Sequence, residues 1–408
     1  MRPRLHRRKS TSSKRMARVS QRLQRVPGSA TLPISTRARE MRAEGRDVIS
    51  FGAGEPDFPT PEHIVAAAQR AANDAANHHY SANAGLLPLR EAIVEYTHTH
   101  SGMPADPSRV LVTNGAKQSI FQAFAALLDP GDEVLLPAPH WVTYPSGIDL
   151  AGGVTVSVPT AMDNGFRVTV EDLEKHHGDR TKLLVFVSPS NPTGAVYTAD
   201  EARAIGEWAR DRDVWVLADE IYQRLVYGDM ELAPSIVGVT SELDNVLVVN
   251  GVAKSFAMTG WRVGWMIGPD DVIAAAARHQ SHATGNVNNV AQMAALAGLT
   301  GAQDTVIAMR EAFDKRRQKM VGMLSEADGI ELAEPQGAFY VFPHVRRLLG
   351  SKFQTTIALA EALLEDAGIA VVPGESFGAP GFIRLSYALS DEDLERGVSR
   401  MLDMFGSI

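Results

Sequence analysis

The sequence predicts an α/β fold built around a mostly parallel sheet, and two observations support this prediction. Between about Val110 and Pro269, short apolar runs alternate with segments whose apolar residues recur at helical spacing, the pattern of repeated β-α units. The runs at 183–187 and 214–218 have no polar alternation, which is typical of strands buried on both faces of a parallel sheet. A parallel sheet with helices on its faces is an α/β architecture.

The length of 408 residues exceeds that of one typical domain, so we expect a large domain and a small one. We assign residues 61–305 to the large domain and residues 27–60 with 306–408 to a smaller α+β domain. In the smaller domain, the sequence predicts helices at 309–324 and 391–405 and strands at 338–342 and 382–386.

Residues 1–26 form a basic arm with ten Arg and Lys and no acid, whereas the remaining chain carries 30 basic and 48 acidic residues. A transit peptide and a nucleic-acid-binding tail are two interpretations of such an arm. We instead expect it to be disordered, or to result from a start codon assigned upstream of a true start at Met16.

The composition favours an enzyme that works in the cytoplasm without membrane or nucleic-acid partners. No apolar run reaches about 18 residues, the length that a membrane span needs. The chain has no cysteine, which excludes disulfides and thiolate metal sites and fits a reducing compartment. The histidine pairs at 78–79 and 176–177 are adjacent residues that point apart on regular elements, so we expect no metal site.

Lys254 lies among small residues in the stretch NGVAKSF (250–256), directly after the apolar run 246–249. This placement delivers an amine from a strand end into a pocket, where burial disfavours the ammonium form and leaves a nucleophile. Arg262 follows eight residues later, and a guanidinium suits a phosphate. The pair suggests pyridoxal phosphate held as a Schiff base, although alone it is also compatible with surface charges on a loop.

Asp219 ends the apolar run 214–218, at the sheet edge where ligands gather. A carboxylate there can keep a pyridine nitrogen protonated, so that the ring accepts electrons. Tyr222, three residues on, can donate to the ring oxygen. The alternative is that Asp219 caps a helix and Tyr222 belongs to the core.

Two further strand ends carry candidate ligands. Asn191 lies in a proline-rich turn after the run 183–187, where its amide can donate to a ring oxygen; an ordinary Asn-Pro turn is the alternative. Gly115 and Ala116 open a helical segment, and free amides at a helix start can bind a phosphate. A simple tight turn is the alternative for this junction.

Together these four segments resemble the fold-type I pyridoxal-phosphate aminotransferases, and within them the class Ib aspartate aminotransferases, a subgroup that includes prephenate aminotransferases. The resemblance runs from about Pro27 to the C-terminus. It implies that Lys254 carries the cofactor and moves the proton, and that Asp219 and Tyr222 complete the catalytic set. The cofactor-binding residues that it implies are Gly115, Ala116, Lys117, Trp141, Asn191, Asp219, Tyr222, Lys254, Arg262 and, reaching the neighbouring subunit, Tyr80.

Tyr80 in this role implies a homodimer with shared active sites. For the substrate, the resemblance implies that Arg384 grips the α-carboxylate and that Lys117, with Thr31 beside it, takes the distal carboxylate. Gly54, Trp141 and Asn191 complete the expected substrate contacts. The family often has a serine three residues before its lysine, where this chain has Gly251, so one phosphate contact is expected to be missing.

The resemblance therefore implies transfer of the amino group of L-aspartate to 2-oxoglutarate. Transamination of prephenate, alone or together with aspartate, is the nearest alternative, because Lys117 and Thr31 suit its second carboxylate too. Transamination of another amino acid by an enzyme of the same class is a further alternative. β-Elimination on the same fold is a more distant one. A sensor protein built on this body would need a DNA-binding domain, and a 26-residue arm is too short to form one.

Overall fold

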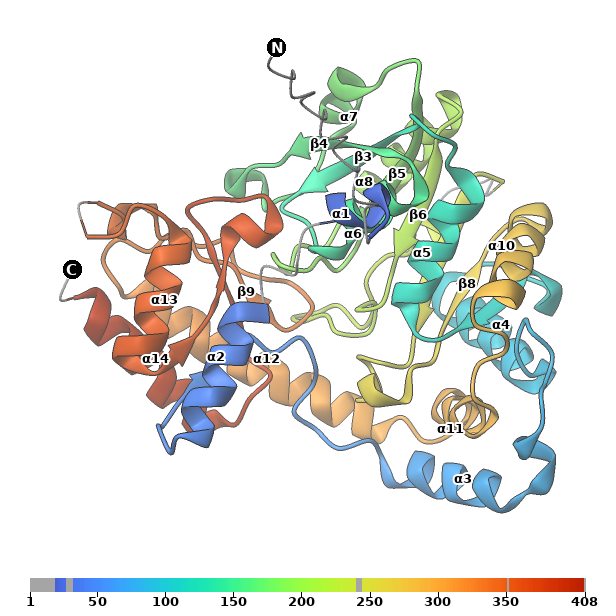
Figure 1. The fold of residues 1–408 in the computed structure, drawn as a ribbon, viewed down its shortest axis with the longest axis horizontal. Helices are drawn as coiled ribbons and strands as arrows, with labels where there is room; N and C mark the ends of the chain where they lie inside the picture. The colour runs from blue at the N-terminus through green and yellow to red at the C-terminus, as the bar shows by residue number, and fades with distance from the viewer. Residues whose placement is uncertain (1–18, 27–31, 240–243, 351, 407–408) are drawn as a thin grey trace, which may run out of the picture.

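The computed structural model describes residues 19–26, 32–239, 244–350 and 352–406. Its centre is a seven-stranded sheet in the order β2-β8-β7-β6-β5-β3-β4, flanked by helices (Figure 1). The strands of this sheet are β2 (Val110–Thr113), β3 (Glu133–Ala138), β4 (Val154–Pro159), β5 (Thr181–Val187), β6 (Trp215–Asp219), β7 (Val246–Gly251) and β8 (Gly264–Ile267). β8 runs antiparallel to the other six strands, which are mutually parallel, so the expected α/β fold with a mostly parallel sheet is confirmed.

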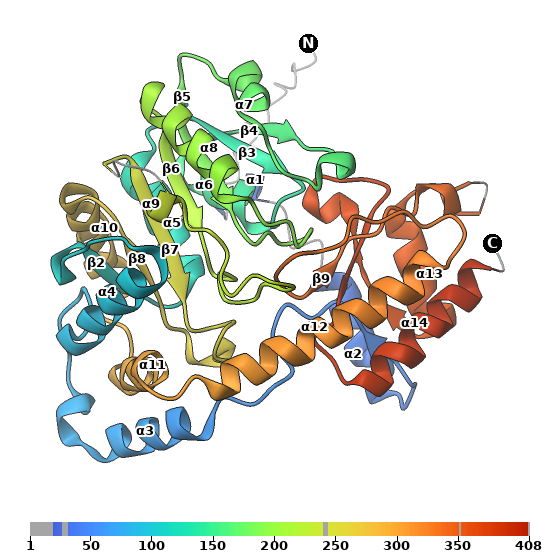
Figure 2. The ribbon, with the colours of Figure 1, turned by 180° about the vertical axis from the view of Figure 1, so that it is seen from behind.

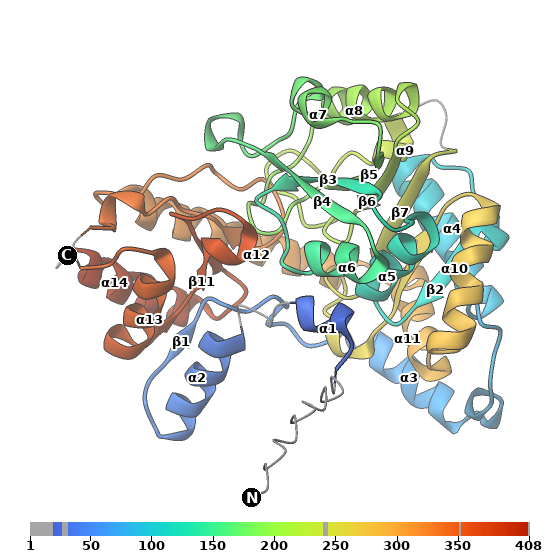
Figure 3. The ribbon, with the colours of Figure 1, turned by 45° about the horizontal axis from the view of Figure 1, so that its top comes forward.

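Two helical layers cover the sheet (Figure 3). Residues on β5 show why both layers are needed, because Leu183 and Val185 pack on one face while Leu184 and Phe186 pack on the other. All four side chains are at most 1 % exposed, which explains the unalternating apolar run. One layer consists of α5 (Ala116–Leu127), α6 (Thr143–Ala151) and α10 (Asp270–Ala283), and the other includes α3 (Glu62–Asn73), α4 (Leu87–Ser101), α8 (Ala199–Asp211), α9 (Ile236–Val239) and α11 (Asn289–Thr300).

A second hydrophobic core lies beside this sheet and is built from both ends of the chain. The helix α12 (Asp304–Ser325) runs from below α11 into this core (Figure 2). β1 (Ile49–Ser50) pairs with β10 (Ile369–Ala370), so an early segment joins the C-terminal part. Its remaining elements are α2 (Leu32–Ala43), β9 (Tyr340–Val341), α13 (Thr356–Ala367), β11 (Val372–Pro373), β12 (Ile383–Ser386) and α14 (Asp391–Phe405). The domain boundaries near residues 60 and 305 stay a prediction.

Three sequence expectations change in extent. The helix expected at 309–324 begins five residues earlier, at Asp304, and the strand expected at 338–342 shortens to Tyr340–Val341. Within the arm 1–26, residues Gln21–Arg25 form the short helix α1, capped by Ser20. Residues 1–18, including Met16, lie outside the described residues.

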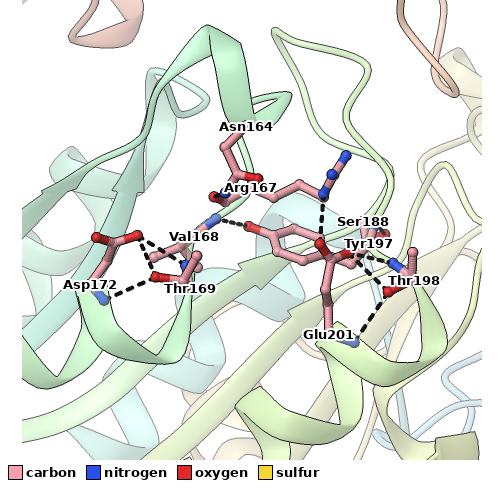
Figure 4. Close-up of polar contacts among 9 residues, drawn as sticks. All are labelled: Asn164, Arg167, Val168, Thr169, Asp172, Ser188, Tyr197, Thr198 and Glu201. Atoms are coloured by element: carbon pink, nitrogen blue, oxygen red, sulfur yellow. Dashed lines mark hydrogen bonds and ion pairs between the residues drawn. The ribbon is translucent and has the colours of Figure 1, made fainter.

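Hydrogen bonds fix the turn that carries Asn191. Helix α7 (Val170–His176) and α8 both begin with a capping box, in which an N-cap threonine and an acidic residue bond to each other's amides (Figure 4). Between the two boxes, the Tyr197 hydroxyl accepts from the amide of Val168 at 2.9 Å. The amide of Tyr197 donates to the Ser188 hydroxyl at 3.2 Å. Ser188 is the first residue of the turn that carries Asn191. These hydrogen bonds therefore anchor the turn to the N-termini of α7 and α8.

The contact between β8 and the start of α5 permits no side chain. A Cβ added to Gly264 would lie 2.4 Å from the amide nitrogen of Ala116. We predict that Gly264→Ala lowers the free energy of unfolding by about 1–3 kcal/mol, because the helix start must move away from the strand. Urea denaturation of the purified variant measures this loss.

Gly322→Ala is the matched control, because nothing lies within 4 Å of a Cβ at this exposed position on α12. It should leave stability unchanged or raise it by up to about 1 kcal/mol, since alanine favours a helix over glycine. Equal effects of the two substitutions would refute the close contact at Gly264.

Candidate active site

The candidate site lies at one edge of the seven-stranded sheet. Strands β2, β3, β5, β6 and β7 are mutually parallel, so their carboxyl ends meet at this edge. Predicted site residues lie at or after the carboxyl end of each of these strands. They are Ala116 and Lys117 after β2, Trp141 after β3, Asn191 after β5, Asp219 and Tyr222 at the end of β6 and beyond it, and Lys254 after β7. Antiparallel β8 begins at the same edge, directly after Arg262 and Val263. The side chains gather around one cavity of about 440 Å³, the size of a cofactor pocket.

Lys254 projects into this cavity from the loop after β7. Its Nζ donates a hydrogen bond to the carbonyl oxygen of Gly54. Burial lowers the pKa of Lys254 to about 8, helped by the positive charges of Arg384 and Arg262 and opposed by the negative charges of Glu55 and Asp219. A larger fraction of this amine than of an exposed lysine is therefore uncharged near neutral pH, which favours a role as nucleophile or base.

Asp219 lines the cavity and is 4 % exposed. Its carboxylate accepts a hydrogen bond from the Tyr144 hydroxyl at 2.7 Å and from the amide of Ile221 at 3.2 Å. Burial raises the pKa of Asp219, while these two bonds and the charge of Lys254 lower it. A cationic ring nitrogen at this position would give the carboxylate the charge partner that burial demands.

Tyr222 also faces the cavity, and its hydroxyl shares a 2.9 Å hydrogen bond with that of Tyr340. Burial and Tyr340 raise the pKa of Tyr222 well above its ordinary value, so it remains a protonated donor. The sequence analysis missed Tyr144 and Tyr340. Tyr144 follows Trp141 by one helical turn, but Tyr340 lies 118 residues from its partner, and no local pattern indicates that contact.

The start of α5 and Arg262 form an anion site. Gly115 is the N-cap of α5 with φ of 83°, and no side chain caps the free amides. A Cβ at Gly115 would lie 2.7 Å from a terminal nitrogen of Arg262, so the guanidinium lies directly against this turn. Arg262 has a left-handed backbone (φ 59°) and donates to the carbonyls of Thr259 and Asn114. Helix amides together with a guanidinium fit a phosphate.

Gly251 also has a structural explanation. A Cβ at this position would lie 3.0 Å from both the Cα of Gly264 and the carbonyl oxygen of Val263. The close approach of the β7 and β8 backbones therefore leaves little room at position 251 for a serine, the residue common there in the family that the sequence resembles.

Arg384 of β12 is 6 % exposed and lies where three segments meet. It donates to Oδ1 of Asn191 at 3.0 Å and to the carbonyl oxygen of Gly52 at 2.9 Å. Its guanidinium lies 4.4 Å from the ring centroid of Tyr340. Its Nε is buried and has no hydrogen-bond partner within the protein. The guanidinium also lines the cavity, where a carboxylate would be a suitable partner for it.

Lys117 lines the same cavity, and its Nζ lies 4.9 Å from the ring centroid of Trp141. Burial and the nearby Arg262 lower the pKa of Lys117. Among the described residues, no carboxylate lies within ion-pair distance of Lys117. A substrate that places a second carboxylate at this side would supply the partner.

Two predicted residues remain apart from this cluster. Tyr80 is 96 % exposed and does not line the cavity of its own chain. Thr31 lies outside the described residues. The cavity also contains Glu55 and Thr259, which the sequence analysis did not single out.

The residues present fit pyridoxal phosphate. The buried acid, the half-buried amine and the uncapped helix start with its arginine match a ring nitrogen, an aldehyde and a phosphate, and they surround one cavity. Such a constellation at the edge of a mostly parallel sheet defines a pyridoxal-phosphate-dependent transferase.

Comparison with known proteins identifies the family to which the chain belongs. The family model for class I and II aminotransferases matches residues 46–401, so the chain belongs to this family of pyridoxal-phosphate-dependent enzymes. An aspartate aminotransferase of Streptomyces avermitilis is 56 % identical over 389 residues, covering 94 % of this chain and 95 % of that protein. An aspartate/prephenate aminotransferase of Cereibacter sphaeroides is 44 % identical, covering 95 % and 98 %.

Solved structures agree with this assignment. The aspartate aminotransferase of Thermus thermophilus with maleate is 40 % identical and superposes with a TM-score of 0.89, covering 95 % of this chain and all of that one. The expected family, fold class and cofactor are thereby confirmed.

Glu220, beside Asp219, is 2 % exposed and accepts a 2.6 Å hydrogen bond from Ser235. Burial raises the pKa of Glu220 to about 7. Because this folded-state pKa lies above the ordinary value, ionisation opposes folding, and stability should fall as pH rises from about 4.5 through 7. The shift corresponds to about 3 kcal/mol, and Glu220→Gln should remove this dependence.

Urea denaturation of the cofactor-free protein at pH 5.5 and pH 8 measures the effect. The exposed Glu311→Gln is the control and should retain the wild-type difference between the two pH values. A Glu220→Gln protein with an unchanged pH dependence would contradict the assignment.

Proposed function

We propose that this enzyme transfers the amino group of L-aspartate to 2-oxoglutarate. The observation that carries this proposal is the pair of cationic side chains, Arg384 and Lys117, that line one cavity together with Lys254. Two cations around a reactive amine fit an amino acid with two carboxylates. The names of the relatives from Streptomyces and Thermus support the same substrate.

Each residue has a proposed task in this reaction. Pyridoxal phosphate, when bound, supplies the aldehyde that takes up the amino group and the ring that accepts electrons when the α proton leaves. Asp219 would hold the ring nitrogen protonated, and Tyr222 and Asn191 would donate to the ring oxygen. Trp141 would cover the ring, while Arg262 with the amides of 115–117 would hold the phosphate. Lys254 would move the α proton from the substrate Cα to the cofactor carbon.

Arg384 and Gly54 position the α-carboxylate end of the substrate. Arg384 belongs to the C-terminal core and Lys254 to the sheet, so a bound substrate bridges the two parts of the molecule. We propose that residues 27–60 and 306–408 move as the small domain against 61–305, and that closure excludes water during proton transfer.

Prephenate remains a second candidate. Its additional carboxylate would also meet Lys117, and the Cereibacter relative is named for both substrates. Relative rates of the purified enzyme with aspartate and with arogenate, the product of prephenate transamination, decide between the two.

We further propose a cytoplasmic location, which the absence of cysteine from the sequence supports.

The function is tested by the absorption spectrum of the purified protein. We expect a yellow protein whose visible band is bleached by aspartate or glutamate, and less readily by alanine or tyrosine. Lys254→Ala should bind cofactor without this bleaching. A protein with no cofactor band, or one bleached equally by every amino acid, would overturn the proposal.

Lys117→Ala tests the dicarboxylic preference. The variant should lose about 2–5 kcal/mol of transition-state stabilisation with aspartate, because the distal carboxylate is left without its partner, and much less with alanine. The measurement is kcat/KM for both substrates.

Lys175→Ala serves as the control, since Lys175 pairs with Glu171 on the outside of α7. Equal losses for aspartate and alanine in Lys117→Ala would show that Lys117 does not recognise the distal carboxylate.

We propose a homodimer in which Tyr80 reaches the phosphate of the neighbouring site. The side chain of Tyr80 is 96 % exposed in the single chain, and this exposure of a large aromatic residue supports a covering partner. Tyr80→Ala should therefore weaken cofactor retention. Sedimentation measures the oligomeric state.

Mixed dimers test the shared site. A subunit with Lys254→Ala lacks its own amine but still lends Tyr80, so it should restore cofactor retention and activity to a Tyr80→Ala partner. If mixing the two variants restores nothing, the sites are not shared through Tyr80.

A further inference from the structure

Residues 54–60 run along the loop that follows Lys254 and are bonded to it at several points. Thr60 donates from its hydroxyl to the carbonyl oxygen of Ala257 at 2.7 Å. The indole nitrogen of Trp261 donates to the Thr60 hydroxyl at 3.0 Å. Lys254 itself donates to the carbonyl oxygen of Gly54. The early segment and the lysine loop therefore hold each other in place.

Glu55 joins the early segment to the lysine loop by a hydrogen bond between side chains, and its carboxylate brings a charge to this contact. Its Oε2 accepts from the Thr259 hydroxyl at 2.8 Å. Thr259 begins the short 3₁₀ helix Thr259–Trp261, after which Arg262 takes its left-handed backbone. The carbonyl oxygen of Thr259 accepts from Arg262 at 2.9 Å. Thr259 thus holds Glu55 through its side chain and Arg262 through its backbone.

The charge of Glu55 also acts on Lys254, because both residues line the same cavity. The charged groups that act on that amine are Arg384, Arg262, Glu55 and Asp219. Of the two acids, Asp219 is engaged by Tyr144 and by a backbone amide. Glu55 belongs to the segment whose Gly54 accepts from Lys254.

We propose that Glu55 is a positioning residue for the lysine loop, which acts in two separable ways on the reaction proposed above. Its charge stabilises the protonated form of the nitrogen of Lys254. Its hydrogen bond with Thr259 fixes the turn that presents Arg262 to the phosphate. The proposal rests on the proposed function only for its effect on catalysis.

Two conservative substitutions separate these contributions. Glu55→Gln removes the charge but keeps an oxygen that can accept from Thr259. Thr259→Val removes the donor but leaves the charge of Glu55 and the shape of the side chain. Both variants should fold and assemble like the wild type, which circular dichroism and sedimentation verify.

The first measurement follows the nitrogen of Lys254. In the cofactor-free full chain, the pH dependence of its acetylation, quantified by mass spectrometry with exposed Lys315 as internal reference, gives its pKa. Removing a nearby negative charge disfavours the protonated amine, so Glu55→Gln should lower this pKa by about half a unit or more. Thr259→Val should leave it near the wild-type value.

The second measurement follows the cofactor in the holoenzyme. The pH titration of its visible band should shift to lower pH in Glu55→Gln and not in Thr259→Val. Release of the cofactor into a trapping reagent should be at least about threefold faster in Thr259→Val, because Arg262 loses its support, and near the wild-type rate in Glu55→Gln.

This crossed pattern is the result that supports the proposal. An unshifted pKa in Glu55→Gln, or identical behaviour of the two variants, overturns it. Neither measurement requires transamination, so a protein that fails to bleach with aspartate but shows the crossed pattern would refute the proposed substrate while leaving the role of Glu55 intact.

Discussion

The buried guanidinium of Arg384 is the constraint on which the site depends. A charge that is 6 % exposed must be satisfied, and its partners are Asn191 from the turn after β5 and the carbonyl of Gly52 from the segment after β1. These bonds join three parts of the chain that lie far apart in the sequence. The same guanidinium lines the cavity, where it can meet a ligand carboxylate.

The parallel sheet positions most of the other residues of the site. Because five parallel strands end at one edge, a few residues at or after each strand end suffice to line the cavity. Antiparallel β8 adds Arg262 to the same edge, and Gly264 lets its backbone approach the start of α5. The electrostatics follow from this convergence, since burial and two arginines lower the pKa of Lys254 while two acids oppose them.

Much of this arrangement could be predicted from local sequence. Apolar runs that lack alternation marked the strands, and the polar residue after each run marked the edge, which is how Asp219, Asn191 and Lys254 were found. Tyr340 and Glu55 were missed for a physical reason: their importance comes from contacts with Tyr222 and Thr259, 118 and 204 residues away, and neither carries a local signal. The roles assigned through the family resemblance remain predictions for every site residue, including Tyr80, whose expected partner is another chain, and Thr31, which lies outside the described residues.

A crystal structure of the protein with pyridoxal phosphate and maleate, a four-carbon dicarboxylate that cannot react, would test the central claim most directly. The account predicts one carboxylate on the guanidinium of Arg384 and the other within about 3 Å of Nζ of Lys117. A second carboxylate bound elsewhere, with Lys117 turned to solvent, would contradict the proposed recognition of a dicarboxylic substrate.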